Sequence, residues 1–172
     1  MPASNVKTVR AAGRVASLHI HPKESGEPML GVDRFELRAA QGIVEDKRYF
    51  GRKPRDPSKP WRRQLTLMER EQIAEHAAVL GLPMFAPGTV RSNIETEGID
   101  LVPWVGRQLR IGATAVVAVY APRDPCQQMD DLAPGLKELM RPDKQGVLTE
   151  ILQSGWVQVG DVVEVIEPAP SA

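Results

Sequence analysis

The chain is poor in cysteine, has few aromatic side chains and lacks long apolar runs. Its single cysteine, Cys126, excludes an internal disulfide and leaves packing, redox or transfer chemistry, or metal ligation. No apolar stretch approaches the ~20 residues that span a bilayer. The N-terminal residues lack the apolar core of a signal peptide. These features predict a cytoplasmic protein in a reducing compartment, with no membrane as a partner.

The chain also lacks an overall charge, because 22 basic residues balance 22 acidic ones. No global field therefore draws it to nucleic acid or to a membrane surface. The motif Gly-x-Gly-x-x-Gly does not occur, and strands and helices do not alternate regularly. Both observations disfavour a doubly wound, nucleotide-binding sheet. The length of 172 residues and the hydrophobic content of 42% fit one globular domain with its own core.

What the chain does contain is a series of short β-rich runs separated by Gly, Pro and Asp. The pattern predicts strands at residues 14–20, 35–38, 108–111, 114–120, 156–159 and 162–166. Helices are predicted between Thr66 and Gly81, where Thr66 and Glu69 have capping-box spacing, and at residues 134–140 and 147–152. Many short strands with few helices indicate a mainly β fold, a closed or half-closed β-barrel over residues 13–166. Residues 1–12 and 167–172 are predicted to be loose termini.

Cys126 follows the most apolar run of the chain, residues 115–120. The thiol is therefore predicted to stand at a strand end, on a loop that two prolines stiffen. Arg123 lies three residues away and favours the thiolate, whereas nearby aspartates oppose it. A free cysteine is often a small buried hydrophobe, so the local sequence leaves reactive and structural roles equally open.

A second feature is the basic segment, residues 47–63, with eight basic residues and one acid. Its three prolines predict a loop rather than a helix. Cations beside Tyr49, Phe50 and Trp61 suit an anionic, partly aromatic ligand: a phosphorylated pterin, a nucleotide or a single-stranded nucleic acid. For most of these residues a solvated charged loop is the favoured interpretation.

The histidines carry a weaker signal. His19 and His21 are two apart on a predicted strand and would share a face, but two ligands do not make a zinc site. Both are predicted to be ordinary surface or turn histidines. His76 falls in the predicted helix and is expected to face solvent.

Further segments occur in a recognisable order along nearly the whole chain. They are residues 42–51, 63–67, 87–94, 97–101, 105–112, 125–126 and 155–162. In this order they resemble the MOSC domain family, named after the C-terminal domain of molybdenum cofactor sulfurases. Many members have Gly-Asp-Arg where residues 45–48 read Glu-Asp-Lys-Arg, and Gly-Glu-Asn where residues 91–93 read Arg-Ser-Asn.

The resemblance implies a β-barrel-like fold and an association with the molybdenum cofactor (molybdopterin). It implies that Cys126 ligates molybdenum or carries sulfur, and a soft thiolate suits both roles. It also implies a set of residues that contact the cofactor: Arg63, Arg91, Asn93, Ser92, Arg48 and Arg123. The arginines would hold the phosphate of the pterin.

Three functions are open at this point. The first is an oxidoreductase that reduces small N-hydroxylated compounds at a cysteine-ligated molybdenum, with electrons from an external donor protein. The second is a sulfur carrier that receives a persulfide on Cys126 from a cysteine desulfurase. The third is a barrel that binds a small ligand or nucleic acid and contains an inert cysteine, with nucleic acid the less favoured ligand.

Overall fold

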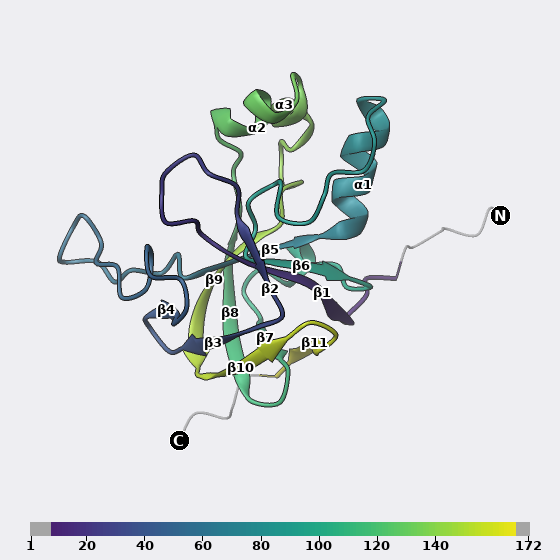
Figure 1. Ribbon diagram of the computed structural model, residues 1–172. Coiled ribbons are helices and arrows are strands. Elements are labelled where there is room, and N and C mark those ends of the chain that lie inside the picture. Colours follow the sequence, from purple (N-terminus) through teal and green to yellow (C-terminus); the bar gives the residue numbers. More distant parts are fainter. Residues whose placement is uncertain (1–7, 168–172) are drawn as a thin grey trace.

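The computed structural model of the chain describes residues 8–167 and shows a barrel of strands with helices at one end (Figure 1). The strands are β1 (Ala12–Ile20), β2 (Leu30–Val32), β3 (Arg34–Arg38), β4 (Gly42–Ile43), β5 (Leu65–Glu69), β6 (Ile94–Glu97), β7 (Gln108–Ile111), β8 (Ala115–Pro122), β9 (Val147–Gln153), β10 (Gly155–Gln158) and β11 (Val162–Ile166). The helices are α1 (Arg70–Val79), α2 (Gln127–Leu132) and α3 (Leu136–Leu139), with a 3₁₀ turn at Val102–Trp104.

The barrel runs in the order β11, β7, β8, β9, β5, β6, β1 and closes because β11 also pairs with β1. Only β5 and β6 are parallel among the pairs described. One row of paired residues crosses five neighbouring strands: Leu18, Ile94, Leu67, Val147 and Pro122. Segments that are far apart in sequence therefore meet beside this row. The closed barrel confirms the predicted fold class.

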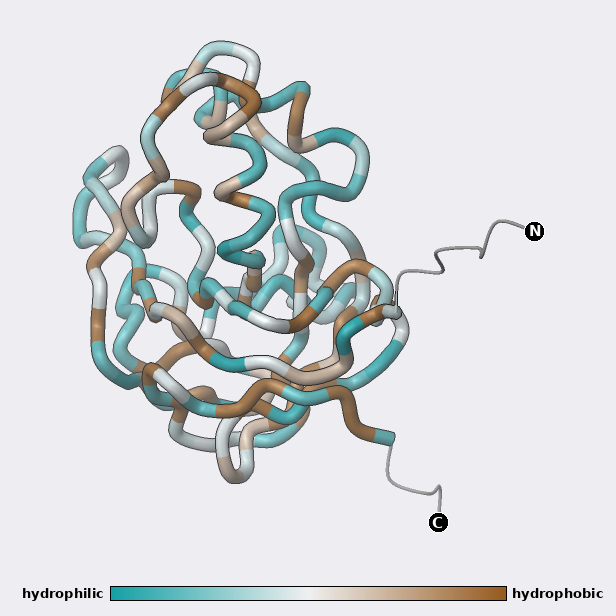
Figure 2. The backbone as a smooth tube through the Cα atoms, turned by 90° about the vertical axis from the view of Figure 1, so that its right-hand side faces the viewer, coloured by the Kyte–Doolittle hydropathy of each residue, from teal (hydrophilic) through white to brown (hydrophobic). Residues whose placement is uncertain are grey.

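Apolar side chains of alternate strand residues fill the barrel, among them Leu18, Leu67 and Ile111. Figure 2 shows hydrophobic and hydrophilic residues alternating along the strands of the lower half of the molecule. A small sheet, β10-β3-β4, covers the lower end in Figure 1 and adds Phe35 and Leu37 to the same core. Burial of this apolar surface is the main stabilising contribution to the barrel.

The three helices lie at the upper end of the barrel in Figure 1. They pack around a second apolar cluster that includes Met68, Ile73, Met129 and Leu136. Met68 belongs to β5, so this strand has apolar contacts on both faces, the barrel core on one and the helices on the other. This arrangement fixes the position of α2, which directly follows Cys126.

The structure corrects three helix predictions. Thr66 lies inside β5, and α1 begins only at Arg70 after an N-cap, Glu69, that makes no side-chain capping hydrogen bond. The segment predicted as a helix at residues 147–152 is strand β9, paired on both sides. The helix predicted at 134–140 shortens to four residues, while α2 was not predicted. Gly81 does end the first helix, with a left-handed φ of 66°.

The histidine predictions also change. A register shift between Val15 and Ser17 in β1 breaks the alternation, and His19 is only 2% exposed. His76 is buried as well, and its Nε2 lies 2.7 Å from the carbonyl oxygen of Lys144. Neither is a surface histidine.

The expected loose termini lie only partly within the described residues. Arg10 and Ala11 are held in place, because the carbonyl of Arg10 accepts a hydrogen bond from the indole of Trp104 and that of Ala11 accepts one from the Val165 amide. Residues 1–7 and 168–172 of the predicted termini lie outside the described range. No described helix is both long and apolar enough to cross a membrane.

Candidate functional site

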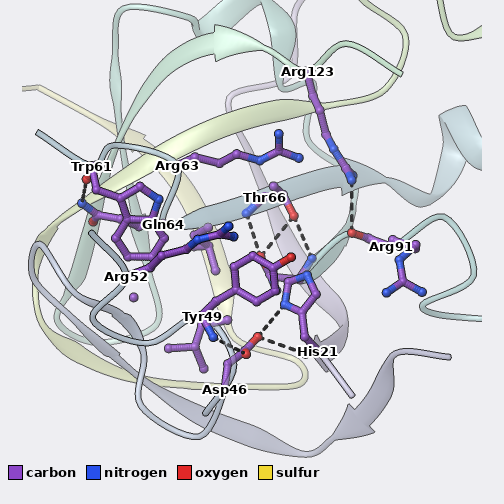
Figure 3. Close-up of a pocket in the computed structure, with 14 residues that line it drawn as sticks. His21, Asp46, Tyr49, Arg52, Trp61, Arg63, Gln64, Thr66, Arg91 and Arg123 are labelled. Atoms are coloured by element: carbon purple, nitrogen blue, oxygen red, sulfur yellow. Dashed lines mark hydrogen bonds and ion pairs between the residues drawn. The ribbon is translucent and has the colours of Figure 1, made fainter. Parts of the chain in front are cut away.

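A cavity of about 240 Å³ opens beside the row of paired residues that crosses five strands. Four arginines contribute to its wall, and we call it the arginine cavity (Figure 3). Its lining comes from five separate parts of the chain: the end of β1, residues 42–46 with β4, the basic segment with the start of β5, the segment before β6, and the end of β8. The charged and polar side chains are His21, Asp46, Tyr49, Arg52, Arg63, Gln64, Thr66, Arg91, Asn93 and Arg123.

Arg123 is the most unusual of these residues because its guanidinium is buried, with 8% of the residue exposed. Its Nη1 donates to the Ser92 hydroxyl at 3.1 Å and its Nη2 donates to the Arg91 carbonyl at 3.3 Å. The pKa of Arg123 is lowered to about 10, mainly by burial and then by the nearby charge of Arg63. The charge of Cys126 acts in the opposite direction and Arg91 lowers the pKa again. Keeping Arg123 charged therefore lowers the stability of the folded protein.

The other three arginines of the cavity add positive charge that no ion pair with a carboxylate in the described part of the chain neutralises. In Figure 3, Arg52, Arg63 and Arg123 extend from different sides toward the centre of the cavity. Within residues 8–167, none of the four lining arginines forms an ion pair with a carboxylate. Arg62, their neighbour, does form one, at 2.7 Å to Glu150. A group of unpaired cations around a cavity favours an anionic ligand, phosphate above all.

Asn93 and Thr66 make the polar floor of the cavity. The Thr66 amide and hydroxyl both donate to Asn93 Oδ1, at 3.0 and 3.1 Å, and the Asn93 amide donates back to the Thr66 hydroxyl at 3.0 Å. Asn93 Nδ2 also donates to the His19 carbonyl at 3.3 Å. This network ties the parallel pair β5–β6 to β1. Asn93 therefore holds the walls together as well as facing the cavity.

His21 and Asp46 form a hydrogen-bonded pair at the opposite wall. Asp46 Oδ2 accepts from the His21 amide at 3.0 Å and lies 2.7 Å from His21 Nδ1. The His21 ring packs on Tyr49 with a centroid separation of 3.9 Å. Burial alone would raise the pKa of Asp46, but the bonds from His21 and Tyr49 hold it below its ordinary value. Asp46 is thus ionised at neutral pH and orients the imidazole toward the cavity.

Arg91 occupies a backbone conformation that favours glycine, with a φ of 63°. The related family motif has glycine at this position, so the structure explains why many members use it. In this chain the side chain extends outward, and its Nη1 donates to the Glu27 carbonyl at 3.1 Å. A non-glycine residue at left-handed φ carries backbone strain, which a glycine at this position would not.

We expect Arg91→Gly to stabilise the ligand-free protein by about 0.5–1 kcal/mol, because it relieves the left-handed conformation. The same variant should bind inorganic pyrophosphate more weakly, since one cation of the cavity is gone. Denaturant unfolding and calorimetric titration measure the two effects. Arg91→Ala is the matched control, because it removes the same side chain but keeps the strained backbone. Equal stability of the Gly and Ala variants would contradict the assignment of strain.

Cys126 lies on the short loop that follows β8, as the N-cap residue of α2, and its thiol is exposed. Its Sγ lies 3.7 Å from Gln128 Oε1. Cys126 does not line the arginine cavity. Arg123 does, and the charge of Cys126 acts on its guanidinium. The predicted position at a strand end on a proline-containing loop is the one observed. The thiol is accessible, free of a disulfide and next to the buried cation.

The structure brings together five of the seven predicted site residues: Arg63, Arg91, Asn93 and Arg123 in the wall, with Cys126 beside Arg123. Ser92 is 0% exposed and lies behind the wall, where its hydroxyl accepts from Arg123. The predicted contact between Ser92 and the cofactor stays a prediction, and the structure shows its hydroxyl as a hydrogen-bond partner of Arg123. Arg48 is exposed and lies over the Tyr49 ring at 5.6 Å, outside the lining residues.

Six of the charged and polar lining residues were not among the predicted site residues: His21, Asp46, Tyr49, Arg52, Gln64 and Thr66. Asp46 and Tyr49 lie in the motif that departs from the family pattern. Arg52 could not be distinguished from the other cations of the basic segment. His21 was considered only together with His19, as a pair on one strand face, and was interpreted as an ordinary surface or turn histidine.

Comparison with known proteins identifies the domain family and the barrel fold. The sequence profile of the MOSC domain matches residues 33–164. No curated protein matched the chain in sequence. Among solved structures, the YuaD protein from Bacillus subtilis superposes with a TM-score of 0.75 at 21% identity, covering 93% of this chain and 98% of that chain.

Two further solved structures have the same fold. YiiM from Geobacillus stearothermophilus gives a TM-score of 0.67 at 18% identity, covering 90% of this chain and 75% of that one. YiiM from Escherichia coli gives 0.63 at 19% identity, covering 95% and 72%. At these identities the similarity concerns the barrel and not the chemistry of the site.

Proposed function

This chain belongs to the MOSC domain family, which is associated with the molybdenum cofactor, and we propose that its arginine cavity binds that cofactor beside Cys126. The single observation that carries the proposal is Arg123, a buried cation that no described carboxylate neutralises. A buried charge without a partner is costly unless a ligand supplies the opposite charge. The phosphate of molybdopterin would supply it.

The remaining donors fit the same group. Arg63 and Arg52 can pair with phosphate oxygens, and Trp61 offers an aromatic ring to a pterin. Cys126 would ligate molybdenum, because a soft thiolate suits a soft metal centre.

The reaction that we propose is reduction of small N-hydroxylated compounds. Such a compound, R–NH–OH, takes up two electrons and two protons and gives R–NH₂ and water, so the nitrogen–oxygen bond breaks. The cofactor, when bound, supplies the oxygen-accepting redox chemistry. The protein supplies the thiolate, the cationic grip on the phosphate and the walls that orient the substrate. One cysteine is too few to hold an iron–sulfur cluster, so electrons would come from a separate donor protein.

Metal and pterin content test this proposal directly. The protein should be produced in a host that synthesises molybdenum cofactor, and again in a host that does not, and purified without oxygen. We expect molybdenum and pterin near equimolar with protein from the first host and neither from the second. Protein from the first host without molybdenum or pterin would overturn the proposal.

The exposure of Cys126 favours one other function, sulfur transfer. A persulfide on an exposed thiol can reach the active site of a partner, whereas a buried one cannot. In that case a cysteine desulfurase would load Cys126 with one additional sulfur atom, detected by mass spectrometry, and the protein would hold little molybdenum. The two functions are thus distinguished by the metal content of the same preparation.

A further inference from the structure

A second, larger cavity of about 590 Å³ lies on the other side of Arg91. Three segments form its walls: the loop between β1 and β2, residues 86–91, and the outer face of α2. Most of the lining side chains are apolar, among them Pro28, Met29, Pro87 and Leu132. We call it the apolar cavity. Its volume lies in the range typical of small-molecule sites.

The two cavities share Arg91, which lines both. Its guanidinium donates to the Glu27 carbonyl at 3.1 Å and so ties the β1–β2 loop to the rest of the wall. Its carbonyl accepts a hydrogen bond from Arg123. Arg91 therefore separates a cationic compartment from an apolar one, and its left-handed backbone places it there.

The thiol lies near this boundary. Gln128, whose Oε1 is 3.7 Å from Cys126 Sγ, lines the apolar cavity, and Arg123, which responds to the charge of Cys126, lines the arginine cavity. Arg123 and Gln128, the two neighbours of Cys126, therefore line different cavities. An anionic ligand fits the first and not the second.

The wall formed by residues 86–91 is preformed. The Gly88 amide donates to Glu95 Oε2 at 3.0 Å, and Arg70 holds Oε1 of the same carboxylate at 2.9 Å. Glu95 is 0% exposed. A Cβ on Gly88 would lie 3.0 Å from the His19 ring, so this segment packs directly on a buried side chain. The apolar cavity needs no rearrangement of this wall to accept a ligand.

We propose that the apolar cavity binds the organic body of the substrate and presents its polar end to the group at Cys126. The occupant is an uncharged molecule with an apolar body about the size of one or two rings. Its lining holds one cation, already hydrogen-bonded to Glu27, and one carboxylate, Asp131, so neither sign of charge is favoured. This inference rests on the proposed function, because it assigns the substrate side of the same centre.

The test uses two N-hydroxylated probes that differ only in their apolar part, benzamidoxime and acetamidoxime. Each is titrated into the isotope-labelled full-length protein as purified, and amide shifts of Gly88, Thr89 and Leu132 are followed by NMR. We expect saturable shifts with benzamidoxime, and binding at least about tenfold weaker for acetamidoxime, because the phenyl ring is withdrawn from water. Equal binding of the two probes, or shifts confined to other regions, would overturn the proposal.

A matched pair of variants locates the site. Leu132→Asp places a charge in the apolar cavity and should weaken benzamidoxime binding at least about tenfold. Leu152→Asp is the control, since Leu132 and Leu152 are both 42% exposed and Leu152 is not among the lining residues. Equal loss in both variants would contradict the assignment.

Molybdenum content of the same samples keeps the two proposals apart. Leu132→Asp should retain the metal of the parent, because Leu132 does not line the arginine cavity. If benzamidoxime binds more tightly than acetamidoxime to a protein that contains no molybdenum, the ligand site in the apolar cavity is supported and the cofactor proposal is contradicted. If the protein contains molybdenum but binds the two probes equally, the cofactor proposal is supported and the ligand site in the apolar cavity is contradicted.

Discussion

Cys126→Ser should lower the molybdenum content of the purified protein at least about tenfold and abolish reduction of N-hydroxylated compounds. A serine hydroxyl has nearly the same shape as a thiol but is not a soft ligand. The pterin should be retained to a larger extent than the metal, since the arginines of the cavity are unchanged. Elemental analysis, pterin fluorescence and activity with a chemical electron donor measure the three quantities.

The fold should not change in this variant. The thiol is exposed and outside both apolar clusters, so we expect the free energy of unfolding to stay within about 0.5 kcal/mol of the parent. Gln127→Ala alters the adjoining exposed residue and is the control for local damage. Full molybdenum content and full activity in Cys126→Ser would exclude metal ligation by the thiol and leave it an inert residue.

Much of the barrel could be predicted because its strands carry local signals. The strands β1, β7, β8 and β11 alternate or form apolar runs bounded by Gly and Asp, and their positions follow from the sequence alone. Strand β9 has no such signal. Thr149 in its centre is 0% exposed, and its hydroxyl donates to the Leu65 carbonyl 84 residues away in sequence. Pairing on both sides decides the state of this segment, and local propensity does not.

The capping-box error has a similar cause. Thr66 and Glu69 have the correct spacing, but the Thr66 hydroxyl bonds to Asn93, 27 residues later, and Glu69 Oε1 accepts from the Leu101 amide at 2.6 Å. Both side chains are used by distant partners, and the helix starts after them. A local motif is decisive only where tertiary contacts leave its side chains free.

The sequence indicated which types of residue form the site. The pairing of the strands decides which of those residues come together. Cys126, Arg63 and Arg91 were identified from motifs that resemble a family. His21 was not, because its role depends on Asp46, 25 residues away, which orients the ring. The pairing of β1, β6, β5, β9 and β8 along one row of residues brings the ends of β1 and β8, and with them His21 and Arg123, around one cavity.

Arg123→Met should stabilise the ligand-free protein while it weakens cofactor binding. Folding lowers the pKa of Arg123 to about 10, which means that the folded state disfavours the charged guanidinium by an amount on the order of 3 kcal/mol. The methionine side chain fills similar space without charge. It forfeits the hydrogen bonds to Ser92 and to the Arg91 carbonyl, at about 1 kcal/mol each. The net expectation is stabilisation by about 1 kcal/mol, measured by denaturant unfolding.

Ligand binding should respond in the opposite direction. Removing a buried cation from around a phosphate costs about 100-fold or more in affinity. Inorganic pyrophosphate should therefore raise the melting temperature of the parent, and raise that of Arg123→Met much less. Protein from a cofactor-producing host should lose its pterin in the same variant.

Arg62→Met is the matched control for these effects. Arg62 belongs to the same basic segment but is exposed, already paired with Glu150, and outside the cavity lining. Its loss should change stability by no more than about 1 kcal/mol and leave the pyrophosphate response intact. Destabilisation of Arg123→Met by several kcal/mol, with an unchanged response, would make Arg123 a structural residue. If Arg123 serves to bind the ligand, Arg123→Met should be more stable than the parent and should bind pyrophosphate more weakly.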